Sequence, residues 1–374
     1  MLRYLSAGES HGRCLVGILE GVPAGLKIDK KQIDRELTER QKGYGRGARM
    51  KIEKDRLKIL SGLRKDRTIG APLALLIKNK DFKIDTLPSV TCPRPGHADL
   101  AGALKYDTKD IRDVLERASA RSTAMRVAIG AICRTFLEGF GVKIISHVSA
   151  IGKVRAQTES FSFDQVRHNA AKSRLKCADK IAEKLMISEI NNAKEAGDSL
   201  GGTFEIIAAG VPAGLGSPFH WDRRLDGALS AAVMSIPAVK AVEIGAGFLN
   251  AASRGSEVHD AIFYSSAKGF FRKTNRAGGL EGGMTNGEPL VLHCAMKPIA
   301  TLKKPLASVN IRTKHETHAA VERADVCAVP ACSVVGEAAV AFCLAKAYLD
   351  KFAGDTIGET KRNYEGYLKQ LKDF

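Results

Sequence analysis

Short apolar runs recur along the chain, and each ends at glycine, proline or a polar turn. The segments 110–138, 179–196 and 334–352 place apolar side chains at helical spacing and predict long helices. The runs with the length and residue types of strands are 14–19, 57–62, 72–77, 142–149, 203–209, 241–244 and 290–296. Because helices and strands alternate irregularly, the pattern favours an α+β architecture over a regular parallel barrel.

One turn sequence occurs twice. Gly-Val-Pro-Ala-Gly-Leu stands at 21–26 after the first strand and again at 210–215 after the strand at 203–209. Each copy precedes a segment with helical spacing, and we expect Asp29 and Asp222 to cap the two helices. The repetition indicates an internal duplication, with two halves related by a pseudo-two-fold axis.

No clear linker divides the chain, although its 374 residues would permit two or three domains. We therefore expect residues 1–374 to form one large domain. The segment 155–200 is polar with weak patterning, which predicts a peripheral insertion. The polar tail from about 354 is expected to be an exposed terminal helix.

The composition is ordinary except for its large positive net charge. The chain is 44% hydrophobic and 26% charged, which excludes disorder over most of its length. Its net charge is +17, and this surplus predicts an anionic partner: nucleic acid, a membrane surface or a phosphorylated small molecule. Most of the surplus lies in residues 1–150, and the segment 40–67 alone holds eleven basic and three acidic residues.

Other features of the sequence predict the cellular compartment of the protein. No stretch reaches the ~18 uncharged apolar residues of a membrane helix, and the first residues lack an apolar signal core. The eight cysteines are scattered, and neither they nor the histidines have metal-site spacing. We expect a cytoplasmic protein with buried thiols, no membrane contact and no metal site.

Two loops carry residues suited to proton transfer or anion binding. His11 and His97 each lie next to glycine in a turn, and histidine exchanges protons near neutral pH. The Lys42–Arg49 segment alternates glycine with Arg46 and Arg49, so that the backbone and the guanidinium groups can approach a phosphate or a carboxylate. A histidine is more often structural than catalytic, and a basic run is more often a solvated loop, so these residues alone do not decide the function.

Several motifs together resemble the chorismate synthase family. In chain order they are GESHG at 8–12, RPGHAD at 94–99, RASAR at 117–121 followed by AMRVA, NRAGGLEGG at 275–283, and an Arg-x-Asp turn at 323–325. The resemblance extends from Arg3 to about Lys346. It implies a β-α-β sandwich with internal pseudo-symmetry, assembled as a homotetramer.

The resemblance also implies an activity. The family converts 5-enolpyruvylshikimate 3-phosphate to chorismate and phosphate by an anti 1,4-elimination, the last common step of the shikimate pathway toward aromatic amino acids. It requires reduced FMN, although the reaction has no net redox change. NADPH would enter only indirectly, through an external flavin reductase or reductant.

The family's functional positions fall on named residues of this chain. His11 and His97 match its active-site histidines, and Asp325 matches its acid near flavin N5. Arg40 and Arg46 match positions assigned to a nicotinamide nucleotide, but substrate anions or loop closure suit them better; Arg46, Arg49 and Arg121 are the candidates for substrate anions. The implied FMN contacts are Arg117, Ala118, Ser119, Pro237, Ala238, Gly282, Lys297, Pro298, Ile299, Ala300, Thr301 and Arg323.

Three positions depart from the common family pattern. Ser122 replaces a usual Glu, Pro237 a usual Asn, and Ala324 a frequent His. These changes concern individual contacts with the cofactor and not the reaction.

Two alternatives remain open at this point. A nucleic-acid-binding protein would use the basic segment 40–67 and would bind with steep salt dependence. A flavin enzyme with its own NAD(P)H:FMN reductase activity would need a nicotinamide site, and the sequence carries no dinucleotide fingerprint.

Overall fold

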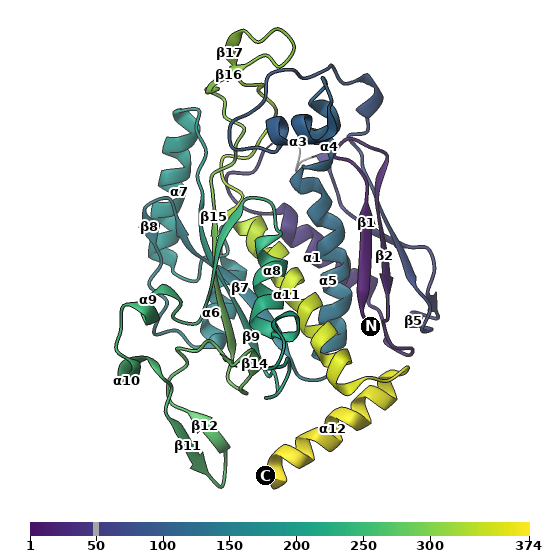
Figure 1. The fold of residues 1–374 in the computed structure, drawn as a ribbon, viewed down its shortest axis with the longest axis vertical. Coiled ribbons are helices and arrows are strands. Elements are labelled where there is room, and N and C mark those ends of the chain that lie inside the picture. The colour runs from purple at the N-terminus through teal and green to yellow at the C-terminus, as the bar shows by residue number, and fades with distance from the viewer. Residues whose placement is uncertain (48–51) are drawn as a thin grey trace.

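Two antiparallel β-sheets enclose a central layer of helices in the computed structural model, which describes residues 1–47 and 52–374 (Figure 1). The first sheet has the order β1-β2-β6-β3, with β1 at Arg3–Ala7, β2 at Cys14–Glu20, β6 at Leu73–Lys78 and β3 at Leu57–Ile59. The second has the order β10-β15-β9-β7-β8, with β10 at Val239–Ile244, β15 at Leu290–Met296, β9 at Gly202–Ala209, β7 at Lys143–Ile151 and β8 at Val154–Arg155. The enclosed helices are α1 (Lys30–Gln41), α5 (Thr123–Glu138), α8 (Leu225–Met234) and α11 (Val329–Phe352). The α+β prediction is confirmed.

The two sheets repeat one arrangement of strands. The order β1-β2-β6-β3 in the first sheet corresponds to β7-β9-β15-β10 in the second. Helix α1 follows β2 as α8 follows β9, and α5 and α11 each come after the last strand of the sheet in their half. The predicted internal duplication is therefore visible in the chain path as well as in the repeated turn.

The repeated turn is held by the same hydrogen bonds in both halves. Thr68 Oγ1 accepts from the Leu26 N–H at 2.9 Å, and Thr285 Oγ1 accepts from the Leu215 N–H at 2.8 Å. Each threonine also donates to the carbonyl of the turn's proline at 2.6 Å. One buried hydroxyl thus satisfies two backbone groups of each turn, so the two copies of the sequence have the same local structure.

Glycines allow the layers of the sandwich to approach closely. A Cβ added to Gly17 of β2 would lie 2.7 Å from the sulfur of Met125 on α5. At Gly130 of α5 it would lie 2.4 Å from the Cβ of Ala338 on α11. At Gly336 of α11 it would lie 2.7 Å from a side chain of β9. Each of the three contacts from sheet to helix to helix to sheet therefore has a glycine at its tightest point.

Helix α11 lies in the middle of this packing. It is the helix that is long and apolar enough to cross a membrane among the described residues, but 83% of the relevant window is buried inside the protein. Such burial is typical of the core helix of a globular protein.

The segment predicted as one helix over 110–138 is divided. Helix α4 (Arg112–Arg117) ends before Ser119, whose backbone is extended and whose side chain accepts from the Arg121 N–H. A 3₁₀ turn at Ala120–Ser122 follows, and α5 starts at Thr123. The apolar spacing was correct, but the local hydrogen bond of a serine competes with the helix here.

Two other helix starts differ from the prediction. Asp222 does not cap α8, because it lies in the 3₁₀ turn Trp221–Arg223 and the helix begins only at Leu225. Helix α11 begins at Val329 and not at 334, since Pro330 suits the first turn of a helix. The prediction that Asp29 caps α1 is confirmed, with its carboxylate accepting from the Lys31 N–H at 2.8 Å.

The remaining elements lie around the sandwich. Residues 155–200 form α6 (Phe163–Lys172) and α7 (Lys180–Glu195), whose inner faces are buried, and the tail forms α12 (Ile357–Asp373). Short helices are α3 (Asp99–Tyr106), α9 (Phe248–Ala251) and α10 (Gly255–Val258). Two-stranded ribbons are β4 (Leu63–Arg64) with β5 (Arg67–Thr68), β11 (Ile262–Ser265) with β12 (Gly269–Arg272), β13 (Leu280–Glu281) with β14 (Met284–Thr285), and β16 (Ala307–Val309) with β17 (Glu316–His318).

Replacing Gly130 with Ala is expected to lower the free energy of unfolding by about 1–3 kcal/mol, because the new methyl group overlaps Ala338 and forces α5 and α11 apart. Gly366→Ala is the matched control, since nothing lies within 4 Å of its Cβ position on α12. There alanine should raise the free energy of unfolding by up to ~1 kcal/mol. Urea denaturation followed by circular dichroism measures both, and equal effects would contradict the role given to Gly130.

Candidate active site

The predicted site residues gather where α5 and α11 begin, in the upper part of the molecule in Figure 1. The two helices run parallel, because Gly130 lies against Ala338 and, further along both helices, Phe136 packs on Tyr348 with ring centroids 6.4 Å apart. Their N-terminal ends, which carry partial positive charge, therefore face the same region.

His11 is held by a buried carboxylate. Glu116 accepts the His11 backbone N–H at 2.7 Å and lies 2.9 Å from ring atom Nδ1. The other ring nitrogen, Nε2, is 3.7 Å from Asp81, which is bound by Arg323 at 2.7 Å and by Lys83 at 3.1 Å. His11 thus stands between two carboxylates, and one of these connects it to the Arg-x-Asp turn.

Both carboxylates beside His11 favour their charged form. Burial alone would raise the pKa of Glu116, but hydrogen bonds from the ring and backbone of His11 bring it below the ordinary value. Burial would likewise raise the pKa of Asp81, but Lys83 and Arg323 lower it. Both groups are therefore ionised at neutral pH and can stabilise a cationic imidazole.

His97 has the same kind of support from its own motif. Its Nδ1 lies 2.5 Å from Asp99, which is fully buried and also binds Arg94 at 2.8 Å. Despite burial, the His97 and Arg94 contacts hold the pKa of Asp99 well below its ordinary range. Arg94 also donates to the Thr301 hydroxyl at 2.7 Å, which ties the RPGHAD motif to the segment 297–301.

Asp325 contacts the glycine-rich segment 43–47. Its carboxylate accepts the Gly47 N–H at 2.5 Å and lies 3.1 Å from Nε of Arg46. The Val326 N–H donates to the Gly45 carbonyl at 2.8 Å. The structure therefore brings Arg46 and Asp325 together although they are far apart in the sequence. Arg49 lies outside the described residues.

Arg40 and Arg121 are buried and share a carboxylate. Asp55 lies 2.7 Å from Arg121 and 3.7 Å from Arg40, and Arg40 also binds Thr123 at 2.9 Å. Burial lowers the pKa of Arg40, while Asp55 opposes that shift. One guanidinium nitrogen of each arginine, Nη1 of Arg40 and Nη2 of Arg121, lacks a hydrogen-bond partner among the described residues.

Most of the implied FMN positions adjoin this cluster. The Ser119 hydroxyl donates to Ser10 at 3.1 Å, beside His11. Lys297 reaches the Gly96 carbonyl at 2.8 Å, next to His97, and its backbone N–H donates to the Ala238 carbonyl at 2.9 Å. Residues 298–300 continue from Lys297, Pro237 precedes Ala238, and Arg117 with Ala118 follows Glu116 directly.

Gly282 is placed away from the other positions. It lies in the turn between β13 and β14, and its neighbour Gly283 contacts Arg224 and Leu225 at the start of α8. Pro237 follows the opposite end of α8, roughly 15 Å away for a helix of ten residues. Within one chain, Gly282 therefore does not join the site.

The carboxylates that hold the cationic residues were not predicted from the sequence. Glu116, Asp99 and Asp81 fix the histidines and Arg323, and Asp55 fixes the buried arginines. A signal was present, because Asp55 is one of only three acids in the basic segment 40–67, and Glu116 and Asp99 lie within or next to the quoted motifs.

A second sequence repeat appears at the site. Glu-Arg-Ala occurs at 116–118 before Ser119 and at 322–324 before Asp325, just ahead of α5 and α11 respectively. Arg112 joins the two copies, with its guanidinium 3.7 Å from Glu116 and 2.9 Å from Glu322. Equivalent segments of the two halves therefore meet at the candidate active site.

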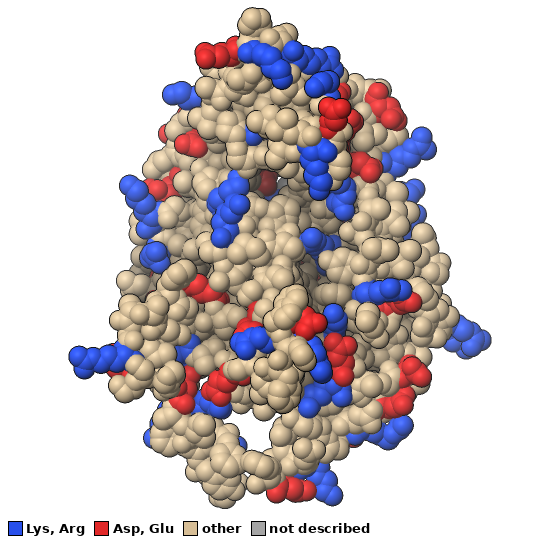
Figure 2. All heavy atoms as spheres, viewed as in Figure 1, with Lys and Arg blue, Asp and Glu red and all other residues tan. Residues whose placement is uncertain are grey.

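The cationic side chains do not form a continuous stripe on the face shown in Figure 2, where lysines and arginines are scattered among carboxylates. Three arginines of the site, Arg40, Arg94 and Arg121, are instead buried and paired, with side chains between 2% and 7% exposed. Arg117 and Arg323 are exposed. This arrangement suits a small anion in a pocket better than an extended duplex.

Comparison with known proteins gives a consistent result across the whole chain. The chorismate synthase family model matches residues 2–349. The chorismate synthase of Symbiobacterium thermophilum is 54% identical over 388 residues, covering 99% of both chains. That of Caldicellulosiruptor saccharolyticus is 55% identical, covering 97% of this chain and 99% of the relative.

A solved structure agrees with these relatives. A crystal structure of chorismate synthase superposes with a TM-score of 0.84 at 43% identity, and the match covers 100% of this chain and 99% of the other. The chain belongs to the chorismate synthase family, the lyases that form chorismate in the shikimate pathway for aromatic biosynthesis.

Proposed function

We propose that this chain releases phosphate from 5-enolpyruvylshikimate 3-phosphate by an anti 1,4-elimination and so forms chorismate. The observation that carries the proposal is the pairing of His11 and His97 with buried carboxylates at the common start of α5 and α11. The substrate, with two carboxylates and a phosphate, carries roughly −4. Two helix N-termini and several guanidinium groups supply matching positive potential.

We propose reduced FMN as the cofactor, because the donors around the site fit a phosphorylated ligand. Arg117 and Lys297 are cationic, the hydroxyls of Ser119 and Thr301 can donate, and buried Arg40 has a spare N–H. The Ala238 backbone adopts the left-handed region (φ 71°) next to the proposed FMN segment 297–301. Strained backbone of this kind is common at ligand sites. When bound, reduced FMN would supply transient electron donation for the loss of phosphate and would recover that electron with the C6 hydrogen, so that there is no net redox change.

The histidines are assigned to proton transfer. Glu116 and Asp99 each engage Nδ1, which fixes the ring orientation and leaves Nε2 as the atom that exchanges a proton. One histidine protonates the leaving phosphate and the other maintains the protonation state of the flavin. The side chain of His11 is 12% exposed and that of His97 is 22% exposed, so little water can compete at either ring.

Asp325 and Arg46 form an ion pair, and we assign a different role to each of them. Arg46 is held by Asp325 and presents its guanidinium to a substrate anion, as we also propose for Arg49 and Arg121. Asp325 lies at the start of α11 and relays a proton from the cofactor side of the site. Ser122, where the family usually has Glu, donates to the Ser119 carbonyl at 3.2 Å and so supports the turn before α5.

The proposed setting is a cytoplasmic enzyme supplied with reduced flavin by an external reductase or reductant. Five of the eight cysteines are buried and none is disulfide-bonded. Burial raises the pKa of the thiols, to about 11 for Cys177 and Cys327, so they are poorly reactive at neutral pH.

We propose a homotetramer. Phe219, Trp221 and Phe248 are 77–85% exposed, and large exposed aromatic side chains are typical of surfaces covered by another subunit. Light scattering after size-exclusion chromatography should give the mass of four chains. A monomer at micromolar concentration would contradict the proposed assembly.

His11→Ala and His97→Ala should each lower kcat about 10²- to 10⁴-fold, because each removes a proton-transfer group. Chorismate formation with anaerobic, photoreduced FMN measures turnover, and FMN titration measures binding, which should be retained. His168→Ala, at an exposed position on α6, is the control. Unchanged turnover in both site variants would refute the assigned role.

Chorismate should form only when reduced FMN is supplied from outside. NADPH with oxidised FMN should give no product, because we assign Arg40 and Arg46 to the site's own ion pairs and to substrate and not to a nicotinamide nucleotide. Product formed with NADPH alone would identify a bifunctional enzyme. The absence of product under both conditions would reject the proposed reaction.

A further inference from the structure

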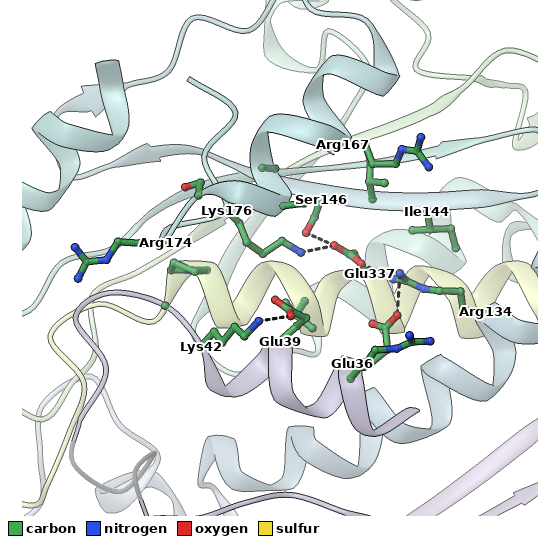
Figure 3. A pocket seen from close by; sticks show the side chains of 18 of the residues that line it. Glu36, Glu39, Lys42, Arg134, Ile144, Ser146, Arg167, Arg174, Lys176 and Glu337 are labelled. Carbon is green, nitrogen blue, oxygen red and sulfur yellow. Dashed lines mark hydrogen bonds and ion pairs between the residues drawn. The ribbon is translucent and has the colours of Figure 1, made fainter. Parts of the chain in front are cut away.

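A cavity of about 560 Å³ lies beside α1, and Arg40 of that helix does not line it (Figure 3). It is bordered by the C-terminal half of α1, strand β7, helix α6 and the first turns of α11. This volume is in the range of sites that take small organic ligands. None of the residues assigned above to substrate or FMN lines it.

The inner wall is a closed network of charges. Glu337 of α11 accepts from Ser146 at 2.5 Å and from Lys176 at 2.7 Å, and it also binds Arg134. Arg134 in turn lies 3.1 Å from Glu36. Burial alone would raise the pKa of Glu337, but Lys176 and Arg134 hold it well below its ordinary value. The carboxylate is therefore ionised, and its partners compensate it.

The remaining charge of the cavity is positive. Among its described lining residues, six are cationic and three are acidic, and the acids are engaged by Arg134, Lys176 and Lys42. Figure 3 shows the guanidinium groups of Arg174 and Arg167 directed away from Glu337, at the borders of the cavity. Arg174 has no carboxylate in ion-pair distance within the described chain, and instead its guanidinium lies over the Tyr44 ring, 4.6 Å from the centroid.

Apolar surface completes the cavity. Ile144, Ala170, Val334 and Pro330 contribute to the walls beside the Tyr44 ring. A guanidinium that stacks on an aromatic ring keeps its N–H groups directed outward, where they can bind a carboxylate in the plane. The geometry points to a flat, ring-containing carboxylate as the ligand, with the ring on the apolar wall and the carboxylate at Arg174.

The cavity shares a segment with the candidate active site. The Tyr44 N–H donates to the Arg174 carbonyl at 3.2 Å, and its hydroxyl donates to Asn191 at 2.7 Å. Two residues later, Arg46 pairs with Asp325. On the α11 side, an added Cβ at Gly43 would lie 3.2 Å from Pro330, five residues after Asp325. A ligand that fixes Tyr44 and Arg174 therefore acts on the segment that carries Arg46.

We propose that this cavity is a second binding site, for an aromatic carboxylate, and that its occupancy changes the affinity of the active site for substrate. The coupling is reciprocal, so substrate changes the affinity of the second site by the same factor.

Calorimetric titration of the full chain with 2-naphthoate, and with its neutral isostere 2-naphthamide, tests binding without turnover. The carboxylate should bind with a Kd below about 1 mM and at least about ten-fold more tightly than the amide. Arg174→Gln should lose most of this difference. Arg64→Gln, at an exposed position on the distant β4–β5 ribbon, should keep it. Equal binding of acid and amide, or an unchanged Arg174→Gln variant, would overturn the site.

The coupling is tested with a variant that fills the cavity. Ala171 is an exposed lining residue, so Ala171→Trp should fold normally while blocking entry. Saturating naphthoate should change the KM for the enolpyruvyl phosphate at least about two-fold in the parent chain and leave Ala171→Trp unaffected. The same change in both proteins would mean competition at the active site, and no change in either would overturn the coupling. Because calorimetry needs no activity, its failure is separable from a failure of the proposed reaction.

Discussion

The close approach of α5 and α11 is the constraint on which the rest of the molecule depends. Glycine at 130 lets the two helices touch, and glycines at 17 and 336 let each helix press on its own sheet. Since close-packed interiors transmit small displacements, the spacing of these layers sets the distance between the two helix starts. The groups that flank the candidate active site are attached to those starts, so the packing of the core determines the geometry of the site.

The positive charge of the chain has a more specific arrangement than its total suggests. Arg40, Arg94 and Arg121 are buried, but carboxylates compensate each of them before any ligand binds. Burying an uncompensated guanidinium would be costly, whereas a paired one can remain inside and keep a spare N–H for an anion. The buried arginines of the site therefore belong to a network of alternating charges.

Much of the fold could be predicted from the sequence, because strands, helices and the repeated turn have local signals. The break at Ser119 and the late start of α8 after Asp222 could not. At Ser119 one local side-chain hydrogen bond ends the helix, and at α8 the first residue, Leu225, donates its N–H to the carbonyl of Gly283, which is distant in the sequence. For the site, motifs identified the histidines and Asp325. The partner of His11 was missed because Glu116 is 105 residues away, and a sequence without its fold does not show which acid meets which base. Asp99, by contrast, is two residues from His97, and its role could have been inferred from the motif itself.

The Glu-Arg-Ala repeat that Arg112 joins shows how a symmetric frame can support an asymmetric reaction. Duplication supplied two equivalent helix starts, and the residue after each repeat then diverged: one half kept a hydroxyl at Ser119, and the other a carboxylate at Asp325. The same packing of a helix on a sheet stabilises both halves. The difference between a hydroxyl and a carboxylate is therefore placed in the segments just before α5 and α11, and the packed core of the two helices is not involved in it.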